Sequence, residues 1–496
     1  MSESVTEKRG AVPAFFRFRP IGDRVLVTNR EGEFAVLTRP EFELLRSGQI
    51  EPGTDLHLQL RARNFLLDGF DRTRASELLS RRKSFVGYGP NLHIMVVTLR
   101  CNQTCLYCHA SRAGVDAAHT DMTPEIAERS VDLAMSSTSP NITIEFQGGE
   151  PLLAFDAIKH LVGYALERGQ VLGKLLEFTL VTNLTLMDDE KLRWLLDRRV
   201  QICSSVDGPA HLHDRQRKLA GGGSSHAQAS HWIRRINEHY AGLGLDPTLY
   251  HVEALLTTTC ETLPLWKEVV DAYADLDCRA LFLRPVDPFG FATRTAELVG
   301  YPIAEYLQFY RNAVDYMIEL NVRGVEILER YASIFLTKIL KGDDPNYLDI
   351  RNPCGAGIGQ VAYNYDGRVF TCDEGRMLHE EGDDTFQIGI VGQTSYREIV
   401  SHETVRAIAL ASNLDAQPDC VDCTYQPYCG TCPVYNHKTQ GTLFGRMREN
   451  MLCAVHKGIQ DYLFTRIGEG NPDVLRVLEQ WTTARPRTHF LQTGVA

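Results

Sequence analysis

Short apolar runs alternate with amphipathic segments through the middle of this chain of 496 residues. The first run, residues 92–99, is rich in branched aliphatic side chains, which is typical of a strand buried on both faces. Thr123 and Pro124 then suit the N-cap and the first turn of a helix. About six strand–helix units follow one another, so the pattern predicts an α/β fold with a parallel, partly closed (β/α)6 barrel. Strands are expected at 92–99, 142–146, 176–183, 200–206, 251–258 and 279–286, and helices at 124–135, 155–169, 188–197, 228–240 and 263–276.

Two different regions flank the barrel pattern. Residues 15–38 alternate apolar and polar side chains in the manner of strands, and residues 39–48 and 56–69 look helical. The last third of the chain is marked instead by closely spaced cysteines, and its segment YNYDGRVFTC predicts a hairpin through an Asp-Gly turn. The expected domains are residues 1–85, a small N-terminal α+β module; residues 86–330, the barrel; and residues 331–496, a cysteine-rich domain that ends in helices.

Charge and hydropathy narrow the range of partners. With 52 Lys and Arg against 63 Asp and Glu, the formal net charge is −11, which argues against nucleic acid as a partner. No apolar run approaches the length of a membrane span, and the N-terminal stretch MSESVTEKRG has no apolar leader. We therefore expect a cytoplasmic protein that does not bind a membrane.

The 13 cysteines supply the first candidate chemistry. In a reducing compartment, cysteines at short spacings indicate metal binding or catalysis rather than disulfides. The stretch CNQTCLYC places Cys101, Cys105 and Cys108 at positions i, i+4 and i+7. Structural zinc takes four ligands, and the adjacent His109 could supply the fourth. A four-iron cluster is the other interpretation, in which three thiolates leave one iron open for an external ligand.

Further candidate residues follow the predicted barrel strands, at the ends where such barrels place their chemistry. Gly148 and Gly149 allow the backbone to approach a ligand closely, and Glu150 supplies an anion that suits a positively charged amino group. Asn183 and Ser205 follow or end later strands and could form hydrogen bonds to the same ligand. Taken alone, the segments around Gly148 and Ser205 are also compatible with ordinary turns.

The C-x3-C-x2-C spacing, with Tyr107 before the last cysteine, resembles that of the radical S-adenosylmethionine (SAM) superfamily. The resemblance implies that a 4Fe-4S cluster on the three thiolates cleaves S-adenosyl-L-methionine to a 5'-deoxyadenosyl radical, which abstracts hydrogen from a substrate. It also implies a set of residues that contact this cofactor: Tyr107, Gly148, Gly149, Glu150, Asn183 and Ser205.

Seven cysteines in the last third resemble the SPASM extension of peptide-modifying radical enzymes. The resemblance implies two auxiliary 4Fe-4S clusters, hence three clusters in all, with one auxiliary cluster short of a cysteine ligand. The spacing of Cys429 and Cys432 is one residue shorter than the family pattern. A zinc ribbon fits less well, because the two C-x2-C pairs lie close together and other cysteines would be left over. The implied ligand sets are Cys420, Cys423, Cys429 and Cys453 for one cluster, and Cys354, Cys372 and Cys432 for the other.

Asp373, directly after Cys372, corresponds in sulfatase-maturating relatives to a general base. Over nearly its whole length, the chain resembles the His-Xaa-Ser system radical SAM/SPASM maturases. This resemblance implies a ribosomally made precursor peptide as substrate, with a cyclophane-type C–C crosslink as the expected product. Formylglycine formation, thioether formation and RNA modification are the alternatives. Flavodoxin or ferredoxin is the expected electron donor, and the N-terminal module either captures a leader peptide by strand addition or caps the barrel.

Overall fold

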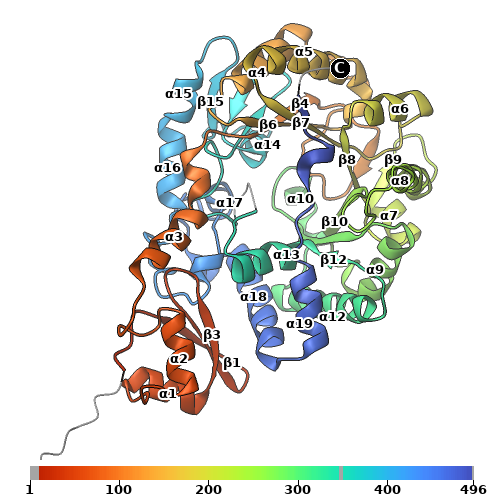
Figure 1. Ribbon diagram of the computed structural model, residues 1–496. Helices are drawn as coiled ribbons and strands as arrows, with labels where there is room; N and C mark the ends of the chain where they lie inside the picture. Colours follow the sequence, from red (N-terminus) through yellow and green to blue (C-terminus); the bar gives the residue numbers. More distant parts are fainter. Residues whose placement is uncertain (1–10, 346–349, 494–496) are drawn as a thin grey trace, which may run out of the picture.

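The computed structural model describes residues 11–345 and 350–493 and has a curved parallel sheet at its centre (Figure 1). Its six barrel strands lie side by side in chain order, each parallel to the next. This arrangement confirms the predicted α/β fold. The strands are β4 (Leu92–Thr98), β6 (Asn141–Gly148), β7 (Leu175–Val181), β8 (Gln201–Ser205), β10 (Glu253–Thr258) and β11 (Ala280–Pro285).

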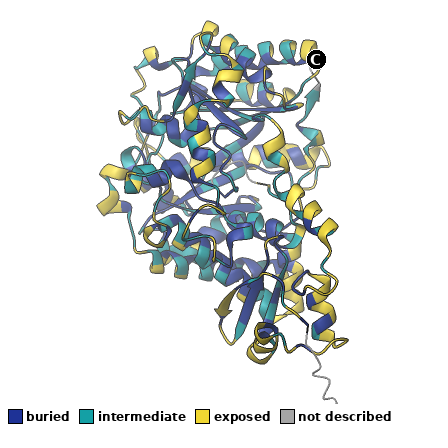
Figure 2. Cartoon of the chain, turned by 90° about the vertical axis from the view of Figure 1, so that its left-hand side faces the viewer, coloured by how far each residue is buried: buried dark blue, intermediate teal, exposed yellow. Residues whose placement is uncertain are grey.

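Helices cover the outer face of this sheet because alternate strand residues are apolar and point outward into a common core. On β7, for example, Leu176, Phe178 and Leu180 are fully buried, and the strands form the dark interior of Figure 2. The covering helices are α4 (Pro124–Met135), α5 (Phe155–Leu172), α6 (Asp189–Asp197), α8 (Ser225–Gly242), α9 (Trp266–Asp275) and α12 (Ile303–Val322).

The other face of the strands is polar and part-exposed. Glu145, Thr179, Cys203 and Glu253 alternate with buried neighbours on β6, β7, β8 and β10. Thr179 Oγ1 donates a hydrogen bond to Glu145 Oε2 at 3.1 Å, which links two neighbouring strands. The barrel interior therefore offers polar side chains to a ligand.

A second set of strands extends the sheet beyond β4. β13 (Gln360–Tyr363) runs parallel to β4, followed by the antiparallel strands β14 (Arg368–Phe370) and β15 (Gln387–Ile390). The Asp-Gly turn predicted between β13 and β14 is present, with Gly367 at a φ of +88°. This hairpin places Cys372 directly beyond the edge of the barrel sheet.

Further helices carry the cysteine-rich region and brace the barrel. α18 packs against α12 and α13, and β16 pairs antiparallel with β7. Two further short strands, β5 and β9, pair outside the main sheet. The elements are β5 (Gln103–Cys105), β9 (Arg217–Leu219), β12 (Leu328–Glu329), β16 (Gln492–Thr493), α7 (Ala210–Gln216), α10 (Phe291–Arg294), α11 (Ala296–Val299), α13 (Arg330–Leu336), α14 (Asp373–His379), α15 (Tyr396–Val400), α16 (Glu403–Ala411), α17 (Pro433–Gln440), α18 (Met451–Glu469) and α19 (Pro472–Gln480).

The N-terminal part forms its own small lobe, at the lower left of Figure 1. An antiparallel sheet of β1 (Arg17–Ile21), β2 (Arg24–Thr28) and β3 (Phe34–Thr38) packs with α1 (Arg39–Ser47) and α2 (Asp55–Ala62), and α3 (Arg72–Arg82) leads to the barrel. The helix expected over residues 56–69 was predicted too long. It ends at Ala62, because Asn64 takes a left-handed φ of 60°.

Several polar contacts join this lobe to the C-terminal region. Arg19 pairs with Asp461 of α18 at 2.8 Å, and the Thr28 hydroxyl donates to the Thr424 carbonyl at 2.7 Å. Across the described ranges of the chain, no helix is both long and apolar enough to cross a membrane.

Candidate active site

The loop of three cysteines follows β4 and is held from two sides. On one side, β5 pairs antiparallel with β9, which places Cys105 opposite Arg217. On the other, the Phe291 backbone N–H donates to the Cys108 carbonyl at 2.8 Å. A side chain at Gly290 would collide with that carbonyl at 2.7 Å, so glycine is required for this close approach. The structure thus brings the three thiols into one fixed, half-buried loop at the C-terminal end of the barrel strands.

His109 does not join these thiols as a fourth ligand. Its Nε2 lies 3.3 Å from the Asp287 backbone N–H and accepts a hydrogen bond from it. Burial lowers the pKa of His109 to about 4, so the ring is neutral. Burial also raises the pKa of both Cys101 and Cys105 to about 12, which indicates that only a bound cation would deprotonate these thiols at neutral pH.

Gly148 and Gly149 are required by the packing of the backbone itself. A Cβ at Gly148 would lie 2.2 Å from the Thr98 carbonyl oxygen, and one at Gly149 would lie 2.3 Å from that of Arg100. The backbone N–H of Gly149 donates to Thr98 at 2.8 Å. These glycines therefore bring the end of β6 against the start of the cysteine loop, and their contact with a cofactor stays a prediction.

Glu150 is completely buried, and its carboxylate has three protein donors. Oε1 accepts from the Leu152 backbone at 3.0 Å and from the Thr182 hydroxyl at 2.6 Å, while Oε2 accepts from the Asn183 backbone at 2.8 Å. Burial raises the pKa of this carboxyl group. The side chain thus joins the ends of β6 and β7, and its contact with a cofactor stays a prediction.

Asn183 and Ser205 lie at the ends of neighbouring strands, as predicted. The Asn183 amide donates to Asn102 Oδ1 at 3.0 Å, which ties it to the cysteine loop. Ser205 is part-exposed at the end of β8, and within the described ranges no side chain bonds to its hydroxyl. The Ser205 hydroxyl is therefore available to contact a ligand directly, whereas the Asn183 amide is already bonded to Asn102.

A buried network around Tyr107 was missed by sequence reasoning. The Tyr107 hydroxyl donates to Asp207, which is fully buried, and Arg217 Nε donates to the same carboxylate oxygen at 3.1 Å. The Arg217 guanidinium also stacks 5.3 Å from the Tyr107 ring and lies 4.0 Å from the sulfur of Cys105. Arg217, the last residue of the charged segment HDRQR, therefore lies against the second cysteine.

The seven C-terminal cysteines lie in two overlapping sets, and their division between two clusters stays a prediction. Four of them line one cavity together with His456 and Lys457: Cys420, Cys423, Cys429 and Cys453. The other three belong to one buried apolar cluster: Cys354, Cys372 and Cys432. Cys432 also reaches the wall of the four-thiol cavity, so the groups are neighbours.

Two thiols of the second group cap helices, which the sequence did not predict. The sulfur of Cys372 accepts from the Gly375 backbone at 3.4 Å at the start of α14, and that of Cys432 accepts from Tyr435 at 3.3 Å at the start of α17. Burial raises the pKa of Cys372 well above its usual value, and the neighbouring Glu374 and Cys354 act in the same direction. Helix N-termini favour the thiolate form and are therefore suited to metal-bound sulfur.

Within residues 11–345 and 350–493, no group of three or more His, Cys, Asp or Glu side chains converges closely enough to hold a single metal ion. Sulfur ligands of one zinc ion, each at about 2.3 Å, would lie within about 4 Å of one another. Thiolates on a 4Fe-4S cluster bind separate irons and lie further apart. The assignment of iron-sulfur clusters to the C-terminal thiols stays a prediction from the cysteine spacing.

Asp373 is nearly buried, at 7% exposure, at the first position of α14. Arg376 Nε donates to its Oδ1 at 2.8 Å, and Nη1 of the same guanidinium lies 3.3 Å from the Ala110 carbonyl in the cysteine loop. Asp373 also lies close enough to His109 to influence the pKa of that ring. The acid beside the C-terminal thiols therefore faces the loop of the first three cysteines.

The model of the radical SAM superfamily matches residues 95–242, the range that contains the cysteine loop, Glu150, Asn183 and Ser205. The chain is 22% identical to the cysteine-type anaerobic sulfatase-maturating enzyme of Clostridium perfringens, over 74% of this chain and 94% of the relative. It is 21% identical to the serine-type enzyme of Bacteroides thetaiotaomicron, over 76% and 90%. These findings define a radical SAM domain, and the protein is a radical SAM enzyme with homology to anaerobic sulfatase-maturating enzymes.

Solved structures share this fold. The structure of anSMEcpe with bound AdoMet has a TM-score of 0.63 and 19% identity, and it covers 78% of this chain and 99% of its own. Streptococcus suis SuiB bound to the precursor peptide SuiA has a TM-score of 0.51 and 12% identity, covering 89% and 99%. At these identities the likeness concerns the fold.

Proposed function

We propose that this radical SAM enzyme carries a SPASM-type C-terminal domain and modifies a ribosomally synthesised precursor peptide. The observation that carries the proposal is the position of Asp373, which follows a thiol of the C-terminal group and contacts the cysteine loop through Arg376 and the Ala110 carbonyl. A general base and a group that takes up electrons would thereby face the same end of the barrel.

Each group of cysteines is assigned one iron-sulfur cluster in this proposal. Cys101, Cys105 and Cys108 would hold the radical SAM cluster, and the two C-terminal groups would hold two auxiliary 4Fe-4S clusters. With S-adenosyl-L-methionine bound and an electron from a flavodoxin or ferredoxin, the radical SAM centre would supply the radical chemistry that abstracts hydrogen from the substrate. The three-thiol group leaves one auxiliary cluster without a fourth cysteine.

Asp373 has a defined task in this proposal. A peptide that loses a hydrogen atom and then forms a bond to a neighbouring ring must also lose a proton and an electron. Asp373 would take the proton, with Arg376 holding the carboxylate in place, and the thiols beside it would hold the electron acceptor. The expected product is a C–C crosslink between an aromatic or His ring and a nearby β-carbon, with a net loss of two hydrogens.

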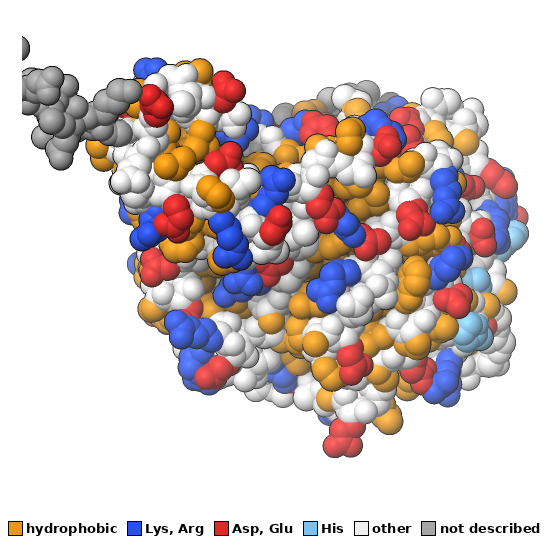
Figure 3. All heavy atoms as spheres, turned by 90° about the horizontal axis from the view of Figure 1, so that it is seen from below, with side chains coloured by type: hydrophobic (Ala, Val, Ile, Leu, Met, Phe, Trp, Pro, Cys, Tyr) orange, Lys and Arg blue, Asp and Glu red, His pale blue; other side chains and the backbone are white. Residues whose placement is uncertain are grey.

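The N-terminal lobe is the proposed site for the leader part of the peptide. Figure 3 shows hydrophobic side chains between charged ones on the lower surface of the molecule, including this lobe. Strand addition to its three-stranded sheet would use such a surface. Residues 1–85 would then form a recognition domain. Exposed large apolar side chains among residues 11–85 are Val12, Phe15, Phe18, Leu44, Leu58, Leu67 and Leu79.

By resemblance, the substrate is a precursor with His-Xaa-Ser repeats, and the electron donor is a flavodoxin or ferredoxin in the cytoplasm. Co-expression with a precursor peptide that carries His-Xaa-Ser repeats, followed by tandem mass spectrometry, tests the reaction. We expect a precursor lighter by two hydrogens, with fragments missing across the crosslinked segment. A precursor of unchanged mass, with active formation of 5'-deoxyadenosine, would contradict the crosslink.

Sulfatase maturation is the second candidate. The two relatives named above are anaerobic sulfatase-maturating enzymes, and their similarity extends over about three quarters of this chain. This activity would use the same thiol groups and the same acid on a Cys or Ser side chain. Incubation with a sulfatase-derived peptide distinguishes sulfatase maturation from crosslinking. A sulfatase-maturating enzyme would convert the peptide to an aldehyde that reacts with hydrazide reagents. The crosslinking enzyme would leave that peptide unmodified.

A further inference from the structure

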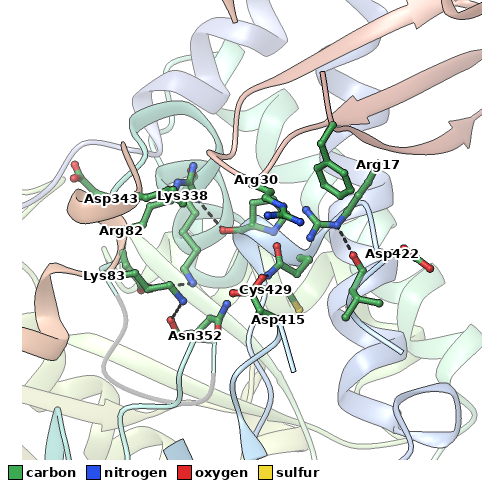
Figure 4. A pocket seen from close by; sticks show the side chains of 16 residues that line it. Arg17, Arg30, Arg82, Lys83, Lys338, Asp343, Asn352, Asp415, Asp422 and Cys429 are labelled. Atoms are coloured by element: carbon green, nitrogen blue, oxygen red, sulfur yellow. Dashed lines mark hydrogen bonds and ion pairs between the residues drawn. The ribbon is translucent and has the colours of Figure 1, made fainter. Parts of the chain in front are cut away.

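A cavity of about 500 Å³ lies between the N-terminal lobe and the cysteine-rich region (Figure 4). It is separate from the barrel interior, and β1, α3 and the loop before Cys429 contribute its walls. The sulfur-bearing residue Cys429 belongs to both this cavity and the four-thiol cavity behind it. A group bound here would therefore lie next to the proposed auxiliary centre.

The lining is unusually rich in cations. Among the described residues of its wall are five Lys or Arg and four Asp: Arg17, Arg30, Arg82, Lys83 and Lys338, with Asp343, Asp344, Asp415 and Asp422. Asp343 and Asp422 lie at opposite edges of the view in Figure 4, away from the centre, and Asp343 pairs with Arg81 outside the cavity. The interior thus has more positive than negative charge.

Most of these cations bind backbone carbonyls, which do not neutralise their charge. Arg17 Nε donates to Val421 at 2.7 Å, Arg82 Nη1 donates to Pro427 at 2.8 Å, and Lys83 donates to Asn352. Lys338 also donates to a carbonyl, and its nearest carboxylate is Asp344 at 3.4 Å. Burial lowers the pKa of Arg17, Arg82, Lys83 and Lys338, which reflects the cost of keeping these charges away from water.

Two residues that line the cavity each have one buried side-chain nitrogen without a hydrogen-bond partner. Arg17 is only 6% exposed, and in the described part of the chain neither its Nη1 nor Arg82 Nε forms a hydrogen bond. An unpaired buried donor on a charged group is costly, so rotation of these guanidinium groups toward a ligand oxygen in the cavity would be favourable.

The Phe15 ring holds two like charges together at the same wall. The Arg17 guanidinium lies 5.0 Å and the Arg30 guanidinium 4.7 Å from its centroid. Burial lowers the pKa of Arg17, and repulsion from Arg30 acts in the same direction. Arg30 is exposed, whereas Arg17 lies deeper. Paired guanidinium groups with free donors are the usual arrangement for carboxylate and phosphate groups.

We propose that this cavity is a binding site for an oxyanion, a carboxylate or phosphate group, held by Arg17 and Arg82 inside and by Arg30 at the entrance. The depth of Arg17 favours a small group on a flexible stem over a flat protein surface. Such a group can come from a free anion or from an acidic side chain of a peptide. The site is independent of the proposed reaction, because none of its cations lies in the barrel.

The test is calorimetric titration of anaerobically purified full-length protein at low ionic strength, without substrate or cofactor. Inorganic phosphate is the first probe, and a short oligoglutamate peptide with its oligoglutamine counterpart is the second. We expect saturable binding that weakens about tenfold or more in Arg17→Gln and in Arg30→Gln, as expected for the loss of a charged hydrogen bond. Arg39→Gln, an exposed cation on α1 outside the cavity, is the matched control and should bind as the wild type does.

The two probes identify the source of the oxyanion. Binding of phosphate alone indicates a free anion, and binding of oligoglutamate with competition by phosphate indicates a peptide side chain. Because Arg30 is exposed, Arg30→Gln keeps the test valid if Arg17→Gln does not fold, which thermal melting shows. No saturable binding by the wild type, or equal weakening by Arg39→Gln, would overturn the proposal.

Discussion

Arg376 and Asp373 form an ion pair at 2.8 Å in which both side chains are nearly buried, with exposures of 1% and 7%. The pair lies between the C-terminal thiols and the cysteine loop, because the same guanidinium reaches the Ala110 carbonyl. It holds the proposed base in one position. It also means that complete removal of the carboxylate would leave a buried positive charge unpaired.

Asp373→Asn is therefore the better variant for testing the base. The amide oxygen can still accept from Arg376, so the fold should persist, while the group can no longer take a proton. We expect 5'-deoxyadenosine formation near the wild-type rate and a loss of modified peptide of about 100-fold or more, measured by liquid chromatography and mass spectrometry. Asp366→Asn, in the turn of the neighbouring hairpin, is the control. Full product yield from Asp373→Asn would exclude its role as the base.

The number of iron-sulfur clusters can be counted directly. Reconstituted protein should contain about twelve irons per chain if three four-iron clusters form. Replacing Cys101, Cys105 and Cys108 together by Ala should remove one third of the iron and all cleavage of S-adenosyl-L-methionine. Replacing Cys354, Cys372 and Cys432 should also remove one third of the iron but leave the radical SAM cluster. Zinc in the C-terminal region of anaerobically produced protein would contradict the assignment.

Glu150→Ala should affect both stability and cofactor binding. The change leaves three donors without an acceptor at the junction of β6 and β7, so we expect a loss of about 2–4 kcal/mol in the free energy of unfolding. Affinity for S-adenosyl-L-methionine should fall as well, while the cluster spectra stay intact. Urea unfolding and equilibrium dialysis measure the two effects, with the exposed Glu190→Ala as control. Unchanged affinity would limit Glu150 to a structural role.

His93 gives a pH dependence with a defined sign. It is 1% exposed and bonds through Nδ1 to the Tyr363 hydroxyl at 2.9 Å and through Nε2 to the Pro90 carbonyl at 3.1 Å. Burial lowers the pKa of His93 to about 4 from 6.5 in the unfolded chain. Between these values the unfolded state binds more protons, so stability should fall by about 3 kcal/mol as the pH drops from 6.5 through 4.

The measurement for His93 compares urea unfolding of the wild type and His93→Gln across this pH range. The variant should be less stable at pH 7 but should lose less stability on acidification. The exposed His119→Gln serves as control, since it should retain the wild-type slope. Parallel curves for the wild type and His93→Gln would mean that this ring does not titrate with unfolding.

Much of the fold followed from local patterns in the sequence. The branched aliphatic run at residues 92–99 and the alternation after it predicted the six parallel strands and their helices, because buried strands and amphipathic helices have different periods. The Asp-Gly turn at Gly367 predicted a hairpin for the same local reason. The helix over residues 56–69 was too long because a single left-handed residue, Asn64, stops it, and such a conformation has only a weak sequence signal.

The sequence by itself determined the residue types and spacings that suit iron-sulfur and radical chemistry, because the spacing of the cysteines is a property of the sequence alone. Only the tertiary structure decided which distant residues meet. Glu150 bonds to the end of β7, Arg217 lies against Cys105, Arg376 reaches the cysteine loop, and Arg17 and Arg82 enclose one cavity. Each of these contacts joins segments far apart in the chain. They depend on how the sheet curves and how the outer domains pack on it, and no local pattern of side chains specifies that geometry.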